Sequence, residues 1–287
     1  EMCIRDRAPM VPVHTWLPDA AEQATPGAST LLVGLLDKIG TLGMIRICLG
    51  LFPQASQWAT PFVLVLAVIS VLWGATMAVT SKDLMRLVSY TSVSHFGFMI
   101  IGIFAVTTTS LTGSIFYMFN HGFSTAALFL VLGFLVKRRG SAQVDAFGGV
   151  QKTAPVLAGM FLFAGLATMS LPGISNFIGE FMVLAGAWSR HPVYVAVATL
   201  GMVLGAVYIL LTYKRTMTGP LTQATKAHVT TDLTGLEKAA LTPLVILLLV
   251  FGFFPRPMLH VIEPVAHQTM SIVGVTDPAP AAEEGVK

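Results

Sequence analysis

The stretch that decides the fold runs from Pro155 to Ser189 and reads PVLAGMFLFAGLATMSLPGISNFIGEFMVLAGAWS. As one straight helix it would be about 50 Å long at ~1.5 Å per residue, whereas the hydrocarbon core of a bilayer is about 30 Å thick. Pro172 and Gly173 lie at its middle and are followed by polar residues. We therefore expect two half-helices joined by irregular backbone, a form that usually marks a transport site.

The composition of the whole chain is that of a membrane protein. Of its 287 residues, 54% are hydrophobic and 11% are charged, whereas a soluble domain carries roughly 25% charged residues. The formal net charge is only +3, and the basic residues lie in loops between apolar runs, which argues against nucleic-acid binding. Cys3 and Cys48 have no ligand-like spacing, so neither a disulfide framework nor a metal site is predicted.

The apolar residues come in runs of about 20, the length at which a helix crosses a bilayer. The fold class expected is an all-α membrane protein, a polytopic transmembrane helix bundle with one discontinuous helix. Seven crossings are predicted: Thr30 to Leu49, Pro61 to Thr80, Leu87 to Phe104, Gly113 to Val136, Pro155 to Ser189, Pro192 to Tyr213, and Ala239 to Phe254.

The rest of the chain is divided around these crossings. Pro9, Pro12 and Pro18 forbid one continuous helix near the start, because proline lacks a backbone donor and clashes one turn back. Four segments result: a non-native leader (1–7), the end of a broken helix with a loop (8–29), the seven-crossing region (30–255), and a tail outside the membrane that is disordered at its end (256–287).

Positively charged residues predict the orientation, because short loops rich in lysine and arginine stay on the cytoplasmic side. Along the chain, every second loop between crossings is rich in basic residues. The loops between these basic loops hold only Arg190, and Arg256 and Lys287 follow the last crossing. This pattern places the C-terminus outside. The alternate loops carry the other basic residues: Lys82, Arg86, Lys137, Arg138, Arg139, Lys152, Lys214, Arg215, Lys226 and Lys238.

Four ionisable residues inside the crossings are the candidates for chemistry: Lys38, His95, His121 and Glu180. A charge at the bilayer centre costs roughly 2.5–3.5 kcal/mol on insertion scales, so such residues are functional suspects by default. Together they predict a proton relay. The structural alternatives are an ion pair of Lys38 with Asp37, histidines bound to backbone carbonyls or at helix contacts, and a glutamate tied to a basic loop residue.

Polar neighbours strengthen the relay hypothesis. Tyr90 and Ser94 are four residues apart and share a helix face, so they are predicted to hold water beside the first histidine. Asn120 and Ser124 flank the second histidine in the same way, with helix contact as the alternative role. The break at Pro172 and Gly173 lies before Glu180, where the polarity of half-helix ends is expected to stabilise a carboxyl group.

No site for a redox group is predicted. The sequence has no glycine-rich phosphate loop after a strand and no clustered cysteine ligands. No nucleotide, flavin, haem or iron–sulfur cluster is therefore expected on this chain, and any redox chemistry would belong to partner subunits.

Several stretches of the sequence match one family. They are PMVPVHTWLPDA (9–20), LDK (36–38), YTSVSHFGF (90–98), NHGFS (120–124) and LPGISNFIGEF (171–181). Through them the chain, from about Ala8 to the last crossing, resembles the antiporter-like subunits of bacterial respiratory complex I, the NADH:quinone oxidoreductase. The resemblance implies fourteen helices with two inverted five-helix repeats, of which this chain would hold the second repeat.

The resemblance also implies roles for residues. Lys38 matches the central lysine of the eighth helix, His95 and His121 the histidines of the tenth and eleventh, and Glu180 the terminal acid of the twelfth. Glutamate at that last position resembles the M type, because the L and N types carry lysine there. Arg7, Ala21 and Met85 depart from the family, standing where a lysine, a histidine and a lysine are expected.

The activity implied is that of a proton-translocating, non-redox subunit with no catalysis alone, in a bacterial inner membrane. L- and N-type subunits would be its partners, and NADH, FMN, iron–sulfur clusters and quinone would be bound elsewhere in the complex. The alternatives are a subunit of a multisubunit sodium/proton antiporter or of a membrane-bound hydrogenase. Glu180 after the Leu-Pro-Gly break favours complex I.

Overall fold

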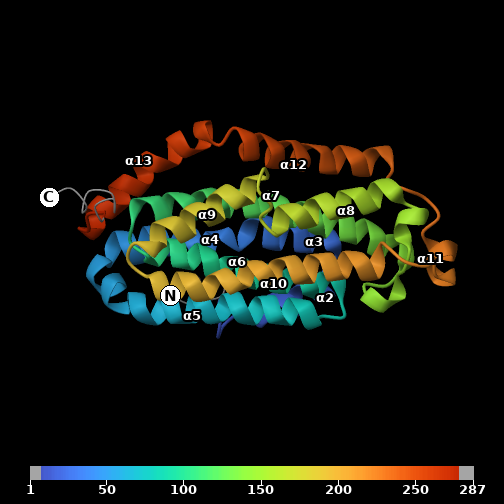
Figure 1. Ribbon diagram of the computed structural model, residues 1–287, viewed down its shortest axis with the longest axis horizontal. Helices are drawn as coiled ribbons and strands as arrows, with labels where there is room; N and C mark the ends of the chain where they lie inside the picture. The colour runs from blue at the N-terminus through green and yellow to red at the C-terminus, as the bar shows by residue number, and fades with distance from the viewer. Residues whose placement is uncertain (1–7, 278–287) are drawn as a thin grey trace.

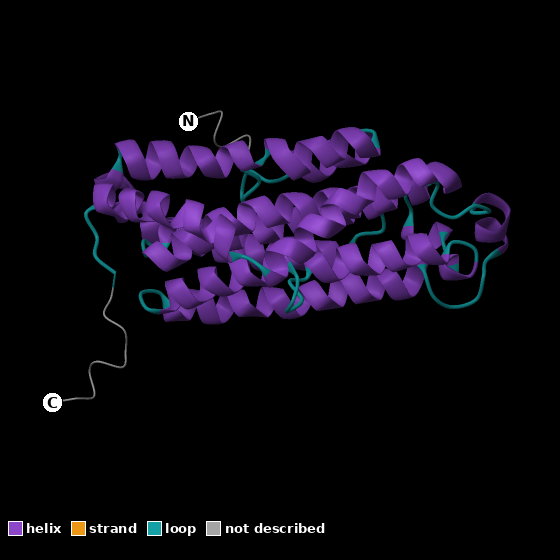
Figure 2. Ribbon diagram, turned by 90° about the horizontal axis from the view of Figure 1, so that it is seen from above, coloured by secondary structure: helices purple, strands orange, loops and turns teal. Residues whose placement is uncertain are grey.

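The computed structural model describes residues 8–277, and over this range the chain is built of helices and loops without a strand (Figure 1, Figure 2). The predicted leader and the last ten residues of the predicted tail lie outside the described residues. The elements are α2 (Trp16–Gln23), α3 (Pro26–Leu31), η1 (Leu32–Leu36), α4 (Lys38–Gly43), η2 (Met44–Leu49), α5 (Pro53–Thr80), α6 (Leu84–Phe104), α7 (Thr108–Arg139), η3 (Val144–Ala146), η4 (Val150–Lys152), α8 (Pro155–Thr168), α9 (Ser175–Trp188), α10 (Pro192–Thr216), α11 (Gln223–His228), α12 (Gly235–Phe253) and α13 (Arg256–Val273).

Five helices in this part of the chain, α5, α6, α7, α10 and α12, are long and apolar enough to cross a bilayer. The all-α membrane fold expected from the sequence is confirmed. The broken helix is also present, because α8 ends at Thr168 and α9 begins only at Ser175. The first crossing is less regular than expected: the wide turns of the π-helices η1 and η2 lie on either side of α4.

The helices lie side by side, with α6 at the centre and α12 at the periphery (Figure 1). Nearly every residue of α6 is buried, whereas α12 contributes few residues to the core. Large apolar side chains such as Trp58, Phe62 and Val203 remain exposed on the outer surface. Many exposed large apolar side chains are stable against lipid rather than water, which agrees with a membrane position.

The predicted tail begins with a helix. α13 occupies Arg256–Val273 and packs Ile262, Ala266 and Met270 against the bundle. The spacing of four residues between these side chains gives one apolar stripe. From the sequence, no helix is predicted in this segment.

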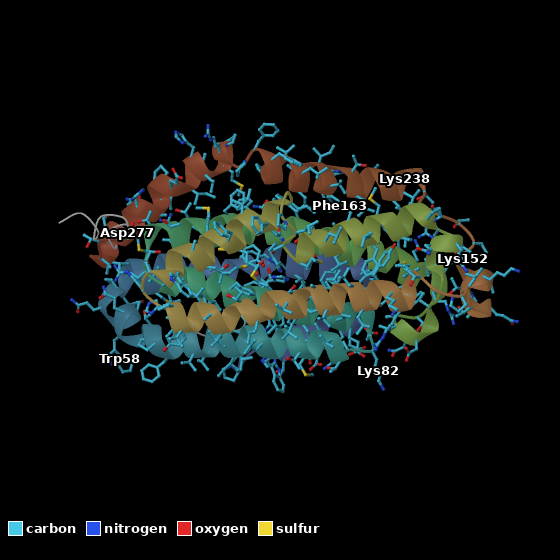
Figure 3. The ribbon with its side chains drawn as sticks, in the orientation of Figure 1. Trp58, Lys82, Lys152, Phe163, Lys238 and Asp277 are labelled. Atoms are coloured by element: carbon cyan, nitrogen blue, oxygen red, sulfur yellow. The ribbon has the colours of Figure 1, made fainter. Side chains whose placement is uncertain are left out.

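Basic residues gather at one end of the bundle. Lys82, Lys152 and Lys238 lie together at that end, and Trp58 and Asp277 lie at the other (Figure 3). This arrangement agrees with the alternation of basic loops in the sequence.

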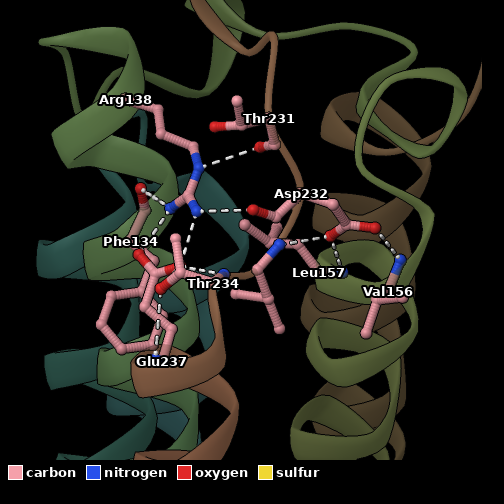
Figure 4. Close-up of polar contacts among 9 residues, drawn as sticks. Phe134, Arg138, Val156, Leu157, Thr231, Asp232, Thr234 and Glu237 are labelled. Carbon is pink, nitrogen blue, oxygen red and sulfur yellow. Dashed lines mark hydrogen bonds and ion pairs between the residues drawn. The ribbon is translucent and has the colours of Figure 1, made fainter.

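A polar clamp joins α7, α8 and α12 at the basic end (Figure 4). Arg138 donates to both carboxylate oxygens of Glu237, at 2.9 and 2.6 Å, and Asp232 accepts from the amides of Val156 and Leu157. Burial acts to raise the pKa of Asp232, but amide hydrogen bonds outweigh it and the pKa lies below its usual value. The carboxylate therefore stays charged at the positive N-terminus of α8, which fixes one end of the broken helix.

Candidate functional site

The four predicted relay residues come from four elements and are brought toward one another inside the bundle. Lys38 begins α4, His95 lies in α6, His121 in α7 and Glu180 in α9. The side chain of Lys38 is 12% exposed, and the other three residues are buried. The structure thus gathers residues that are far apart in sequence, while their role stays a prediction.

Lys38 forms an ion pair with Asp37, as expected if its role were structural. Its Nζ lies 2.9 Å from Oδ1 of Asp37 and donates to the carbonyl of Val33 at 2.6 Å. The ammonium also lies 5.3 Å from the centre of the Phe96 ring, within cation–π range. Asp37 lies between η1 and α4, and this irregular turn lets two consecutive side chains meet.

Lys38 also borders a cavity. The cavity has a volume of about 600 Å³, lies between this crossing, α7 and α13, and is lined mainly by apolar side chains. Lys38 therefore contacts the interior of the bundle on one side and lines this cavity on the other.

A continuous set of hydrogen bonds leads from His95 to Glu180. Nδ1 of His95 is hydrogen-bonded to the hydroxyl of Tyr117, and this hydroxyl donates to Oε2 of Glu180 at 3.3 Å. Ser170 donates to the same carboxylate oxygen. Because a phenol hydroxyl both accepts and donates, Tyr117 joins the imidazole to the carboxyl group directly.

His121 lies beside this set without a direct hydrogen bond to it. Its ring centre is 5.1 Å from that of His95 and 6.1 Å from that of Tyr117. Its Nε2 pairs with the hydroxyl of Thr125 at 3.1 Å. We refer to His121, His95, Tyr117, Glu180 and Ser170 as the buried polar series.

Two members of the buried polar series, Tyr117 and Ser170, were missed by sequence reasoning. Tyr208 was also missed, and its hydroxyl lies 3.3 Å from Nε2 of His95. A signal for Tyr117 exists, since it precedes His121 by four residues and so shares its helix face. Tyrosine in an apolar run raises little suspicion because its ring is itself apolar.

The supporting residues predicted beside His95 have other partners. Ser94 donates to the carbonyl of Val71 at 2.9 Å, and the hydroxyl of Tyr90 lies 3.5 Å from Nη2 of Arg86. Neither hydroxyl is bonded to the imidazole among the described contacts. The predicted role of the two hydroxyls in holding water beside the imidazole stays a prediction.

Of the two supporting residues predicted around His121, Ser124 joins two helices and Asn120 bonds within its own helix. Ser124 donates to the carbonyl of His121 at 3.2 Å and accepts from Nδ2 of Asn176 at 2.8 Å. Asn120 donates to the carbonyl of Phe116 at 2.8 Å. Ser124 therefore ties α7 to the first turn of α9.

The helix break shapes the surroundings of Glu180. Ser170 has a φ of 57° and Gly173 a φ of 95°. Left-handed backbone is uncommon for serine and is found where the structure around it holds it in place. Here it follows the end of α8 and directs the Ser170 hydroxyl at the carboxyl group of Glu180.

Comparison with known proteins identifies the family. Residues 4–205 match the family model described as "NADH:quinone oxidoreductase/Mrp antiporter, TM". The chain belongs to this family. It is 48% identical over 280 residues to "NADH-quinone oxidoreductase subunit M" of Mycobacterium tuberculosis, covering 98% of this chain and 50% of the relative. The protein of the same name from Rickettsia prowazekii is 40% identical over 255 residues, covering 89% and 52%.

Two solved structures share the fold of this chain. A chain of "Respiratory complex I from Thermus thermophilus with bound NADH" matches with a TM-score of 0.86 and 30% identity, over 95% of this chain and 57% of that one. A chain of the Mrp complex from Dietzia sp. matches with a TM-score of 0.83 and 22% identity, over 94% and 59%. The present chain spans about half the length of the relatives it matches.

Close packing of α9 on α7 holds Glu180 near Tyr117. A Cβ added at Gly179 would lie 2.7 Å from Cβ of Tyr117 and 2.9 Å from its amide nitrogen. Contacts this short force one helix away from the other, because backbone atoms have no rotamer to change. Gly179 is therefore required for the approach of the two side chains.

Gly179→Ala is expected to destabilise the full-length protein by about 1–3 kcal/mol, the usual range for overpacking, and to lengthen the distance between Tyr117 and Glu180. Thermal unfolding of the purified protein in detergent measures the first effect. Gly159→Ala is the matched control, since an added Cβ there meets nothing within 4 Å. Equal unfolding temperatures for the two variants would contradict the close-packing argument.

Proposed function

We propose that the chain is the proton-conducting part of a membrane subunit of an NADH:quinone oxidoreductase of the complex I kind. The observation that carries the proposal is the buried polar series, in which Tyr117 joins His95 to Glu180 inside an apolar bundle. Buried ionisable groups are costly in a membrane and persist where they serve ion or proton pathways. The named relatives of the chain support the redox complex as its setting.

In this proposal, a proton enters from the cytoplasm and passes Lys38, His121 and His95. A histidine accepts a proton on one ring nitrogen while releasing one from the other, so the imidazole passes protons on without moving far. The Tyr117 hydroxyl takes the proton from His95 and hands its own to Glu180. Glu180 then releases the proton outward when its surroundings change.

The ion pair of Lys38 with Asp37 is the control element of the pathway. At 2.9 Å between Nζ and Oδ1 it holds positive charge close to the carboxylate. Opening the pair would bring that charge nearer to the imidazoles and drive their protons toward Glu180. Conformational and electrostatic changes in the redox arm would supply the energy for this opening.

The same proposal covers the partners and the setting. NADH, FMN, iron–sulfur clusters and quinone are assigned to partner subunits, and the L- and N-type antiporter-like subunits are the membrane neighbours. The membrane is the bacterial inner membrane, with the basic end of the bundle in the cytoplasm and Asp277 outside. The gathering of lysines at one end supports this orientation (Figure 3).

Inverted membrane vesicles separate this function from that of a sodium/proton antiporter. A strain lacking the gene would be complemented with the full-length gene, and proton uptake would be followed after adding NADH or after imposing a sodium gradient. We expect complementation to restore NADH-driven uptake. Restoration of sodium-driven exchange alone would assign the chain to an Mrp-type antiporter and overturn the proposal.

A further inference from the structure

A second cavity lies at the basic end of the bundle, away from the buried polar series. It has a volume of about 730 Å³ and lies between the end of α5, the short helix η3 and the last turns of α10. Lys82 and Arg215 line it from two sides, and Asp145 lines it from η3. The proposed proton pathway uses none of these residues.

The charges around the cavity are unpaired within residues 8–277. The side chains of Lys82, Arg215 and Asp145 form no hydrogen bond or ion pair there, whereas nearby Arg86 and Arg138 each bind a carboxylate. Two cations and one acid in the lining leave a net positive charge, which attracts an anion. One acidic side chain beside them favours a ligand that carries a positive group as well.

Apolar rows run from the cavity toward the middle of the membrane. On α10, Val207, Leu211 and Arg215 are spaced by four residues, so they form one row, and Val207 is 43% exposed. On the neighbouring α5, Leu72 and Val79 are seven residues apart and share a face. A ligand in the cavity therefore meets charges at the membrane boundary and apolar side chains below it.

We propose that this cavity binds a phospholipid with an ethanolamine headgroup. The phosphate lies between Lys82 and Arg215, the ammonium group beside Asp145, and the acyl chains along the α5 and α10 rows. Basic pockets between transmembrane helices on the cytoplasmic side bind phosphate-bearing lipid headgroups, and Asp145 adds a partner for the ammonium group. A free phosphate ion would use the two cations but neither the acid nor the apolar rows.

Photo-crosslinking in the assembled complex tests the site. The complex containing the full-length subunit is placed in nanodiscs with a photoactivatable phosphatidylethanolamine, and adducts on α5 and α10 are mapped by mass spectrometry. Neutralising both cations, as Lys82→Gln with Arg215→Gln, is expected to reduce these adducts about tenfold, as for loss of charge-assisted contacts. Lys214→Gln, which removes an adjacent charge outside the cavity lining, is expected to leave them unchanged.

Comparisons that do not use the double variant keep the test decisive even if that variant fails to assemble. Phosphatidylethanolamine is expected to label the site more strongly than phosphatidylglycerol, and Asp145→Asn is expected to remove that preference. Equal labelling by both lipids in the parent would overturn the proposal. So would loss of the adducts on adding excess inorganic phosphate, which would indicate a site for a soluble anion, and so would unchanged adducts in the double variant.

Discussion

Replacing Glu180 by glutamine is expected to lower NADH-driven proton uptake roughly tenfold or more, the scale of effect seen when a proton-transfer group is removed. Glutamine keeps the size of the side chain and still accepts hydrogen bonds from Ser170 and Tyr117. It cannot bind and release a proton in the way that the carboxyl group does. The change therefore removes the last protonatable group of the buried polar series and leaves its packing in place.

The measurement uses inverted membrane vesicles that carry the full-length gene, with NADH oxidation and proton uptake followed together. Glu263→Gln is the matched control, because this glutamate is exposed on α13. Glu180→Asp keeps a carboxyl group and is expected to retain more activity than Glu180→Gln. Unchanged proton uptake in Glu180→Gln would show that the carboxyl group is structural.

Sequence reasoning found the charged members of the site because charge is conspicuous in an apolar run. Lys38 and Glu180 stand out in this way, and the Pro172–Gly173 pair predicted the break before Glu180 that α8 and α9 display. Burying an ionisable group in a membrane is costly, and the apolar residues around it in the sequence are enough to reveal it without a structure. Neighbour relations across helices cannot be read in the same way.

Tyr117 and Ser170 illustrate that limit. Neither residue stands out in the sequence, and the importance of each comes from its hydrogen bond to Glu180 on α9. Glu180 is 63 residues from Tyr117 along the chain. Ser94 shows the same limit, because its hydroxyl donates to the carbonyl of Val71 on α5, whereas the hydroxyl of Tyr90 lies 3.5 Å from Nη2 of Arg86 on its own helix.

Tyr117→Phe is expected to reduce NADH-driven proton uptake by about one to two orders of magnitude, comparable to loss of a positioned acid–base group. The ring remains and continues to pack on His95 and His121. Only the hydroxyl is lost, and with it both the bond to Nδ1 of His95 and the bond to Glu180. Loss of the hydroxyl leaves the buried Nδ1 of His95 without this partner, so we expect the free energy of unfolding to fall by about 1–3 kcal/mol.

Two other tyrosines separate conduction through Tyr117 from a general need for tyrosine hydroxyls. Tyr213→Phe is the matched control, because its ring stacks on Phe161 outside the buried polar series. Tyr208→Phe removes a bond to Nε2 of His95 but no bond to Glu180, so we expect an intermediate effect. If Tyr117→Phe pumps as well as Tyr213→Phe, protons reach Glu180 by another route. If proton uptake falls in Tyr117→Phe while the variant still folds and assembles, the hydroxyl of Tyr117 is part of the path.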